Sequence, residues 1–420
     1  MTGLLPSIPA RGEQASIWFM FKVLALLGLA LMTDSYDLQA ASFAAPTLAA
    51  AWHVPKAAFG PLFGAGLAGV FFGAPLFGWI GDKFGRKRAI LFACIAYGGF
   101  SLITTLVGNP TEFAVLRFLM GLGCGGALPN VVALATELAP HPRRGMLTSL
   151  VFVAMPLGGA IPGYVASGLV PSFGWQAIFV VGGVAPILFA ALILLGLPES
   201  PVFFPAAKNA SAPASPAPTQ TTRLTELLSR QFAATTLLLW VMFAGTLLTI
   251  YLISNWLPTI LHAYGLTPAA VANVNFLYAI GGALSGLGIS LVIDRIGLGA
   301  VFALYALALV SVVLVAFSEF SQTGLAVTMF FCGFAVTGVQ YALNVSAGLI
   351  YPPRIRSSGV GAALGVGRIG SVAGAMLGAL VVVRQAAGRD LFLVPVLPLA
   401  IGIFAVALLM RRRTFAPTGV

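Results

Sequence analysis

Long apolar runs, separated by short polar segments, form the dominant pattern along the chain. Most runs are close to or longer than the roughly 20 residues with which an α-helix crosses the hydrocarbon core of a bilayer. We count twelve runs and expect each of them to form one membrane-spanning helix. They cover residues 18–48, 57–80, 89–107, 111–138, 147–170, 175–196, 231–261, 268–293, 300–317, 322–350, 358–384 and 390–410.

The composition excludes most classes of soluble protein. Hydrophobic residues make up 59% of the 420 residues and charged residues only 8%, against about 25% charged residues in ordinary soluble domains. A chain this apolar is neither a soluble enzyme, a disulfide-stabilised secreted domain nor a disordered segment. The three cysteines lie inside apolar runs and are expected to pack as small hydrophobic residues. No spacing of cysteine or histidine predicts a metal site.

The formal net charge of +11 raises the question of a nucleic-acid partner. The cationic residues, however, lie in short clusters between the apolar runs, and no basic stripe with interleaved aromatic residues is present. With both termini placed in the cytoplasm, most of the 22 Lys and Arg residues lie on the cytoplasmic side, as the positive-inside rule requires. We therefore expect a multi-pass protein of the inner (plasma) membrane, with both termini cytoplasmic and no nucleic-acid partner.

One polar insertion divides the runs into two sets of six. Residues 205–222 are rich in Pro, Ala, Ser and Thr, a composition that need not fold and cannot be buried in lipid. The sequence therefore predicts three parts. They are a six-helix bundle over residues 1–196, a cytoplasmic linker over 197–230 and a second six-helix bundle over 231–420.

The two halves also resemble each other. Asp82 aligns with Asp294, and Gly121 aligns with Gly333, at one constant offset. Because six is an even number of crossings, two such repeats have the same orientation in the membrane. Parallel repeats are typical of secondary transporters, whose site lies between the halves near the membrane midplane.

Several motifs resemble those of the major facilitator superfamily. Residues Gly78–Arg88 are similar to its GxxxDRxGRR loop, with Lys83 in place of the usual Arg. Arg117–Gly123 resembles its RxxxGxG pattern, and Pro198–Pro201 resembles its PESP motif. The resemblance implies an all-α membrane protein with twelve transmembrane helices in two parallel six-helix repeats. Residues Gly121–Gly126 also fit GxGxxG, but inside a spanning run this pattern indicates close helix packing rather than a dinucleotide site.

Three further segments resemble the aromatic acid:proton symporters of that superfamily. Asp34–Pro46 is similar to their DGxDxxxxGxxxP signature, with serines in place of its two glycines. Asn255–Pro258 and Gly365–Gly370 resemble motifs of the same family, and Asp37–Ala41 is most similar to its hydroxyphenylpropionate branch. The resemblance implies transport of a small aromatic carboxylate.

Asp34 and Asp37 are the strongest candidates for proton coupling. They are three residues apart and share one face of the first predicted helix. An aspartate at bilayer depth costs about 2.5–3.5 kcal/mol on insertion scales, so a pair of them needs a use or a partner. The alternatives are a helix end that reaches the headgroups, or a pair held statically by Arg117.

Two arginines inside predicted helices are candidate ligands for the substrate. Arg117 could be the counter-ion of the aspartates, which we favour, a substrate ligand or a static partner. Arg368 lies about 15 Å deep at 1.5 Å per residue, and its planar guanidinium suits a carboxylate. A structural pair is the alternative for Arg368. Further candidates, each of which could instead serve helix packing, are Trp256, Asn255, Tyr251, Tyr341 and Gln340.

A cluster of charged residues near the predicted cytoplasmic ends is a candidate conformational gate. Its members are Asp82, Arg86, Glu137 and Arg144. Such ion pairs would close the inner side in one state and break on switching. The alternative is ordinary positive-inside topology, which explains the cations but not the two acids.

Taken together, the sequence predicts a monomeric importer of a small aromatic carboxylate that works with protons, by alternating access. It needs no cofactor, because the proton gradient supplies the energy, and its other partners are protons and the lipid bilayer. An exporter of organic acids or drugs in the same superfamily is the main alternative. A membrane-embedded enzyme or a receptor is more remote, since no nucleophile–base pair, metal ligands or signalling domain is present in the sequence.

Overall fold

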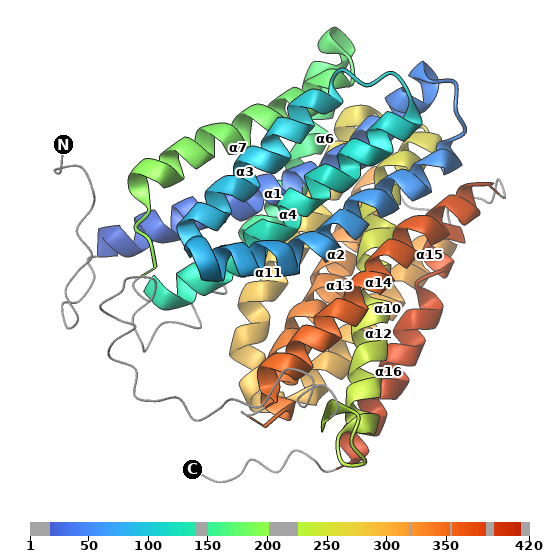
Figure 1. Cartoon of the computed structure of the whole chain (residues 1–420). Helices are drawn as coiled ribbons and strands as arrows, with labels where there is room; N and C mark the ends of the chain where they lie inside the picture. The colour runs from blue at the N-terminus through green and yellow to red at the C-terminus, as the bar shows by residue number, and fades with distance from the viewer. Residues whose placement is uncertain are drawn as a thin grey trace, which may run out of the picture. The chain divides into compact units, whose positions relative to one another are not determined.

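The computed structural model describes residues 17–138, 150–200, 226–318, 321–352, 355–383 and 390–412. Over these residues the regular elements are helices and none is a strand (Figure 1). Twelve helical segments in the described residues are long and apolar enough to cross a membrane. The prediction of an all-α chain with twelve membrane-spanning helices is therefore confirmed.

Two compact units make up the fold. The first comprises the described residues up to 200 together with Thr267–Ala272, and the second comprises the remaining described residues from 226 onward. The helices of the first are α1 (Ile17–Ala51), η1 (Lys56–Ala58), α2 (Phe59–Phe84), α3 (Arg86–Thr104), α4 (Pro110–Leu138), α6 (Ala154–Phe173) and α7 (Gln176–Gly196). Most of the predicted linker lies outside the described residues.

The second unit contains the remaining helices, except that the start of α11 is grouped with the first unit. They are α10 (Ala233–Ala263), α11 (Pro268–Ile296), α12 (Leu298–Phe317), α13 (Gln322–Ile350), α14 (Arg356–Val383), α15 (Asp390–Leu393) and α16 (Val396–Arg411). The last predicted run is thus two helices rather than one. Pro395 caps the start of α16, and a proline has no N–H with which to continue a preceding helix.

The third spanning helix begins three residues earlier than the apolar run alone predicts. Gly85 has a φ of 107°, and its N–H bonds the carbonyl of Gly81, which closes α2. A positive φ is readily adopted only by glycine. The chain therefore turns at one residue, and α3 starts directly at Arg86.

Glycines bring α2 and α4 into close contact. A Cβ on Gly69 would collide with the carbonyl of Phe118, and a Cβ on Gly121 would collide with the carbonyl of Gly66. A Cβ on Gly123 would likewise come too close to the main-chain nitrogen of Tyr97 on α3. Close helix packing is therefore the role of the GxGxxG pattern, as small residues allow between membrane helices.

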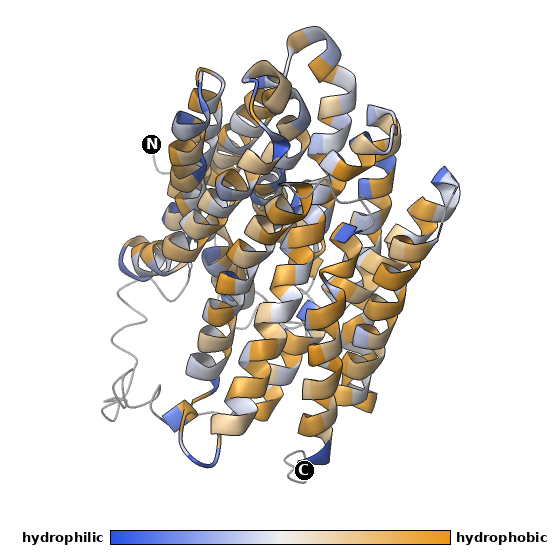
Figure 2. Cartoon of the chain, turned by 90° about the vertical axis from the view of Figure 1, so that its right-hand side faces the viewer, coloured by the Kyte–Doolittle hydropathy of each residue, from blue (hydrophilic) through white to orange (hydrophobic). Residues whose placement is uncertain are grey.

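Hydrophobic residues make up most of the length of the helices, as the hydropathy colours of Figure 2 show. Many large ones are exposed, among them Phe72 on α2, Leu188 on α7 and Phe404 on α16. An apolar surface of this extent is unstable in water but matches lipid. The protein is accordingly a multi-pass membrane protein.

Candidate functional site

Asp37 lies in the interior of the first unit, where α1 faces α3 and α7. Its side chain is 0% exposed. The hydroxyl of Ser101 on α3 donates a hydrogen bond of 2.9 Å to Oδ1, whereas Oδ2 has no hydrogen-bond partner in the described residues. On α7, Gly182 leaves the necessary space, because a Cβ there would collide with Asp37 and Ser101. The carboxyl group is thus enclosed, with a neutral hydroxyl as its hydrogen-bond donor.

Asp34 is buried one turn earlier on the same helix, with 2% of its surface exposed. Beside it, the hydroxyl groups of Thr33 and Tyr97 share a hydrogen bond of 2.8 Å between α1 and α3. Burial of both aspartates in the middle of α1 argues against the alternative that they reach the lipid headgroups from a helix end.

Arg117 on α4 is also buried, at 2% exposure. Its Nη1 donates to the main-chain carbonyl of Asp37 over 2.7 Å, and its Nη2 donates to the carbonyl of Leu38 over 2.9 Å. The guanidinium therefore binds the backbone of α1 rather than the Asp37 carboxylate. Its favoured role as counter-ion of the aspartates stays a prediction, since the guanidinium interacts electrostatically with Asp37 without a direct bond to the carboxylate among the described residues.

Arg368 and Tyr251 are brought together in the second unit. Nη1 of the half-buried Arg368 on α14 donates to the hydroxyl of Tyr251 on α10 over 3.3 Å. Of the three glycines around Arg368, Gly367 and Gly370 pack against α10, whereas Gly365 faces open space. The cation thus has a neutral oxygen as its partner, with space on one side of the helix.

Trp256 serves helix packing in this conformation. It is 0% exposed, and its indole N–H donates to the carbonyl of Ala375 on α14 over 2.9 Å. Gly378 lies directly against its ring. The neighbouring Asn255 is buried as well. A ligand could stack on this tryptophan only after α10 and α14 move apart.

Gln340 and Tyr341 follow each other on α13. The amide nitrogen of Gln340 donates to Asn344 over 3.1 Å, while its buried Oε1 has no hydrogen-bond partner in the described part of the chain. Tyr341 is half-buried and packs near Gly286 on α11. Gln340 therefore retains one acceptor for a donor group.

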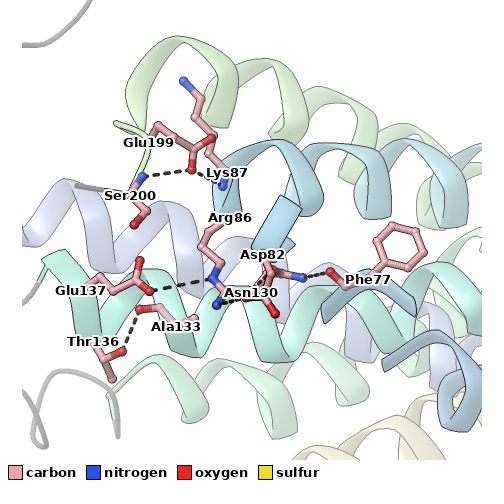
Figure 3. Close-up of polar contacts among 10 residues, drawn as sticks. All are labelled: Phe77, Asp82, Arg86, Lys87, Asn130, Ala133, Thr136, Glu137, Glu199 and Ser200. Carbon is pink, nitrogen blue, oxygen red and sulfur yellow. Dashed lines mark hydrogen bonds and ion pairs between the residues drawn. The ribbon is translucent and has the colours of Figure 1, made fainter. Parts of the chain in front are cut away.

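Three of the four predicted gate residues meet around Arg86 (Figure 3). Arg86 pairs with Asp82 at 2.5 Å and with Glu137 at 3.8 Å. It also donates to the side chain of Asn130 over 3.5 Å. Arg144, the fourth predicted residue, lies outside the described residues.

Glu199 was not singled out in the sequence, yet it caps α3 (Figure 3). Its Oε1 accepts hydrogen bonds from the main-chain N–H groups of Lys87, at 2.9 Å, and Ser200, at 3.0 Å. The ammonium group of Lys87 in turn donates to the carbonyl of Leu194 over 2.8 Å. The only signal in the sequence was the PESP motif that contains this residue.

Comparison with known families identifies the chain. The sequence profile of the Major Facilitator Superfamily matches residues 27–265. The chain belongs to the major facilitator superfamily. This confirms the resemblance of the loop, helix and PESP motifs.

Relatives within the superfamily are transporters of aromatic acids. The 4-hydroxybenzoate transporter PcaK of Pseudomonas putida is 32% identical, over 86% of this chain and 86% of its own length. The 3-(3-hydroxy-phenyl)propionate transporter of Escherichia coli is 33% identical, over 87% and 88%. These identities support a transporter but do not separate the hydroxyphenylpropionate branch from the hydroxybenzoate branch.

A solved structure supports the superfamily fold. A bacterial homologue of the human lysosomal transporter Spinster superposes with a TM-score of 0.73 and 17% identity, over 96% of this chain and 100% of that one. At this identity the likeness concerns the fold alone.

Proposed function

We infer that this superfamily member imports a small aromatic carboxylate together with protons, by alternating access across the inner membrane. Its relatives include proteins named as transporters of 4-hydroxybenzoate and 3-(3-hydroxyphenyl)propionate, and the substrate belongs to this chemical class. Both termini are cytoplasmic, the protein works as a monomer, and no cofactor is needed.

The observation that supports proton coupling is the enclosure of Asp37. An ionised carboxylate in this position costs several kcal/mol, because one hydroxyl bond replaces water. Among the described residues, the nearby Arg117 guanidinium bonds the main chain of Asp37 rather than its carboxylate. The neutral acid costs far less. This conformation therefore suits the proton-loaded state, and release of the proton belongs to another conformation.

Arg368 is proposed to bind the carboxylate of the substrate. Its guanidinium has the Tyr251 hydroxyl as its side-chain partner, and a carboxylate is a stronger acceptor for the planar fork. Tyr341 and the acceptor of Gln340 are the candidates for contacts with the ring and its hydroxyl substituent, and Asn255 and Arg117 remain secondary candidates.

Energetics favour import with a proton over import of the anion alone. An anion that enters against an inside-negative potential costs about 2.3 kcal/mol per 100 mV. One accompanying proton cancels the charge, and the pH gradient then drives accumulation.

Uptake into proteoliposomes tests the proposal. Labelled 4-hydroxybenzoate, 3-(3-hydroxyphenyl)propionate and benzoate are offered with an acid-outside pH gradient, with and without a protonophore. We expect accumulation above equilibrium for at least one acid, and its loss when the protonophore is added. Uptake that ignores the gradient, or loss of preloaded acid driven by it, would contradict proton-coupled import.

A further inference from the structure

Ser101 lies within hydrogen-bond distance of two acceptors but has one hydroxyl proton. Its Oγ is 2.9 Å from Oδ1 of Asp37 and 3.1 Å from the main-chain oxygen of Phe179 on α7. A hydroxyl can donate one hydrogen bond and accept others. Ser101 is 0% exposed, so water does not compete for either position. At any moment it therefore donates either to α1 or to α7.

The protonation state of Asp37 determines whether the Ser101 hydroxyl donates to Asp37 or to the Phe179 carbonyl. A carboxylate is a much stronger acceptor than an amide carbonyl, so Ser101 donates to the ionised Asp37. When Oδ1 carries a proton, that proton is donated to Ser101 Oγ, and the serine hydroxyl is free to donate to Phe179. Both arrangements satisfy every proton of the three groups.

We propose that Ser101 is a positioning residue that converts protonation of Asp37 into one additional hydrogen bond between α3 and the main chain of α7. The inference rests on the proposed role of Asp37 in proton coupling. It assigns Ser101 no contact with the substrate. Its effect reaches the transport cycle through the packing of α7.

Two features of α7 near Asp37 and Ser101 lower the energetic cost of a small displacement of this helix. Pro186 lacks the N–H that would bond the carbonyl of Gly182 within the helix. A cavity of about 210 Å³ lies against the same segment, lined by Tyr36, Gly182 and Pro186 among other residues. A missing helical bond and an adjacent space both lower the cost of a small shift.

Phe179, whose carbonyl the Ser101 hydroxyl can reach, belongs to a cluster of aromatic side chains. Its ring packs edge-on against Phe113 of α4 at 5.7 Å between centroids and against Trp175 at 5.9 Å. Trp52, at the end of α1, packs against both of these rings. A change in the hydrogen bond to the Phe179 carbonyl is thus passed to a cluster that joins the ends of α1, α4 and α7.

Several other titratable groups lie near Asp37, and none of them is removed by a substitution at Ser101. No residue of α7 is titratable, and α6 contributes only Tyr164. The groups nearby are Asp34 and Tyr36 on α1, Tyr97 and Cys94 on α3, and Arg117 and Cys124 on α4.

A matched control is provided by Tyr36. Its hydroxyl donates to the carbonyl of Ile178 over 2.8 Å, next to the carbonyl that Ser101 can reach, but no hydrogen bond joins it to Asp37 in the described residues. Tyr36→Phe therefore removes a buried hydroxyl bond to the same turn of α7 and leaves the hydrogen bond between Ser101 and the Asp37 carboxyl group in place. Ser101→Ala removes both hydrogen-bonding possibilities of the Ser101 hydroxyl, the one to Asp37 and the one to the Phe179 carbonyl.

Infrared titration of the full-length protein in detergent tests the proposal. The carboxyl C=O band of Asp37 is assigned by its loss in Asp37→Asn. In Ser101→Ala, we expect the band to titrate about one pH unit higher than in the wild type, because the ionised form loses a charge-assisted hydrogen bond. The band also moves to higher wavenumber, since the acid loses its acceptor. Tyr36→Phe should change neither property.

Two outcomes would overturn the role of Ser101. One is an unchanged midpoint in Ser101→Ala, and the other is an equal shift in Tyr36→Phe, which would indicate loss of packing on α7. If Ser101→Ala does not fold, Ser101→Cys, a weaker donor of similar size, should shift the midpoint in the same direction by less. Gradient-driven accumulation by Asp37→Asn would overturn the coupling role of Asp37 instead, and the comparison of midpoints would still decide the role of the hydroxyl.

Discussion

The carboxylate of Glu199 accepts a hydrogen bond of 2.9 Å from the main-chain N–H of Lys87 in the first turn of α3. This contact joins the end of α7 to the turn between α2 and α3. The first N–H groups of a helix have no partner inside the helix, and the helix dipole favours a negative charge at this end. Glu199 thus caps a helix that begins 113 positions earlier in the sequence with three basic residues.

We therefore expect Glu199→Ala to destabilise the first unit by about 1–2 kcal/mol, because the cap and its charge are both lost. Glu199→Gln keeps an acceptor and should cost less. Thermal unfolding in detergent measures both. Glu112→Gln is the control, since its carboxylate accepts from the main chain of Gly108 at an exposed site. An effect of Glu112→Gln as large as that of Glu199→Ala would contradict the capping argument.

The orientation in the membrane can be tested with single cysteines. With both termini cytoplasmic, a cysteine at position 215, in the linker, and one at Ser321, before α13, should label from opposite sides with an impermeant thiol reagent. The three native cysteines, Cys94, Cys124 and Cys332, are buried and should give little background in the folded protein. Labelling of both introduced cysteines from one side would exclude this topology.

Replacement of Asp37 separates coupling from transport. Asp37→Asn has nearly the size of the neutral acid and can keep a hydrogen bond with Ser101, but its amide cannot release a proton. We expect gradient-driven accumulation to be lost, while exchange of substrate at equal concentrations persists. The two assays are run on the same proteoliposomes, with Asp34→Asn in parallel. If accumulation survives in Asp37→Asn and is lost in Asp34→Asn, Asp34 rather than Asp37 is the residue that carries the proton.

The sequence alone was sufficient for the fold because each spanning helix carries its own signal. Hydrophobic runs depend on local composition, and the fixed spacing of Asp34 and Asp37 already implied a shared face. The partners of these residues were not predictable in the same way. Ser101 is one serine in an apolar run, and nothing local indicates that α3 turns it toward α1.

The packing partners of glycine and tryptophan residues were likewise not predictable from the sequence. Around Arg368, Gly365 faces open space whereas Gly370 packs against α10, and the sequence of this glycine-rich segment does not indicate which of its glycines does which. Trp256 was a candidate for stacking on the substrate, yet its indole bonds α14. Which face of a membrane helix meets a neighbour depends on tertiary packing, because lipid and protein interior are equally apolar.

Arg368 gives the sharpest test of substrate recognition. Arg368→Ala should weaken binding of an aromatic acid by about 2–5 kcal/mol, if the ion pair is buried and hydrogen-bonded. Arg368→Lys keeps the charge but loses the planar fork, so transport should fall steeply rather than mildly. Stability in detergent should remain near that of the wild type, because the side-chain partner left behind is the neutral hydroxyl of Tyr251.

The decisive comparison is the binding of an aromatic acid against its neutral amide. The wild type should strongly prefer the acid, and Arg368→Ala should lose that preference. Tyr251→Phe is the matched control, since it removes the hydroxyl that Arg368 contacts but leaves the cation in place, and it should keep the preference. If Arg368→Ala still distinguishes acid from amide, another cation binds the carboxylate. Arg117 is then the candidate, and it would first have to release the carbonyls of Asp37 and Leu38 that it holds in this conformation.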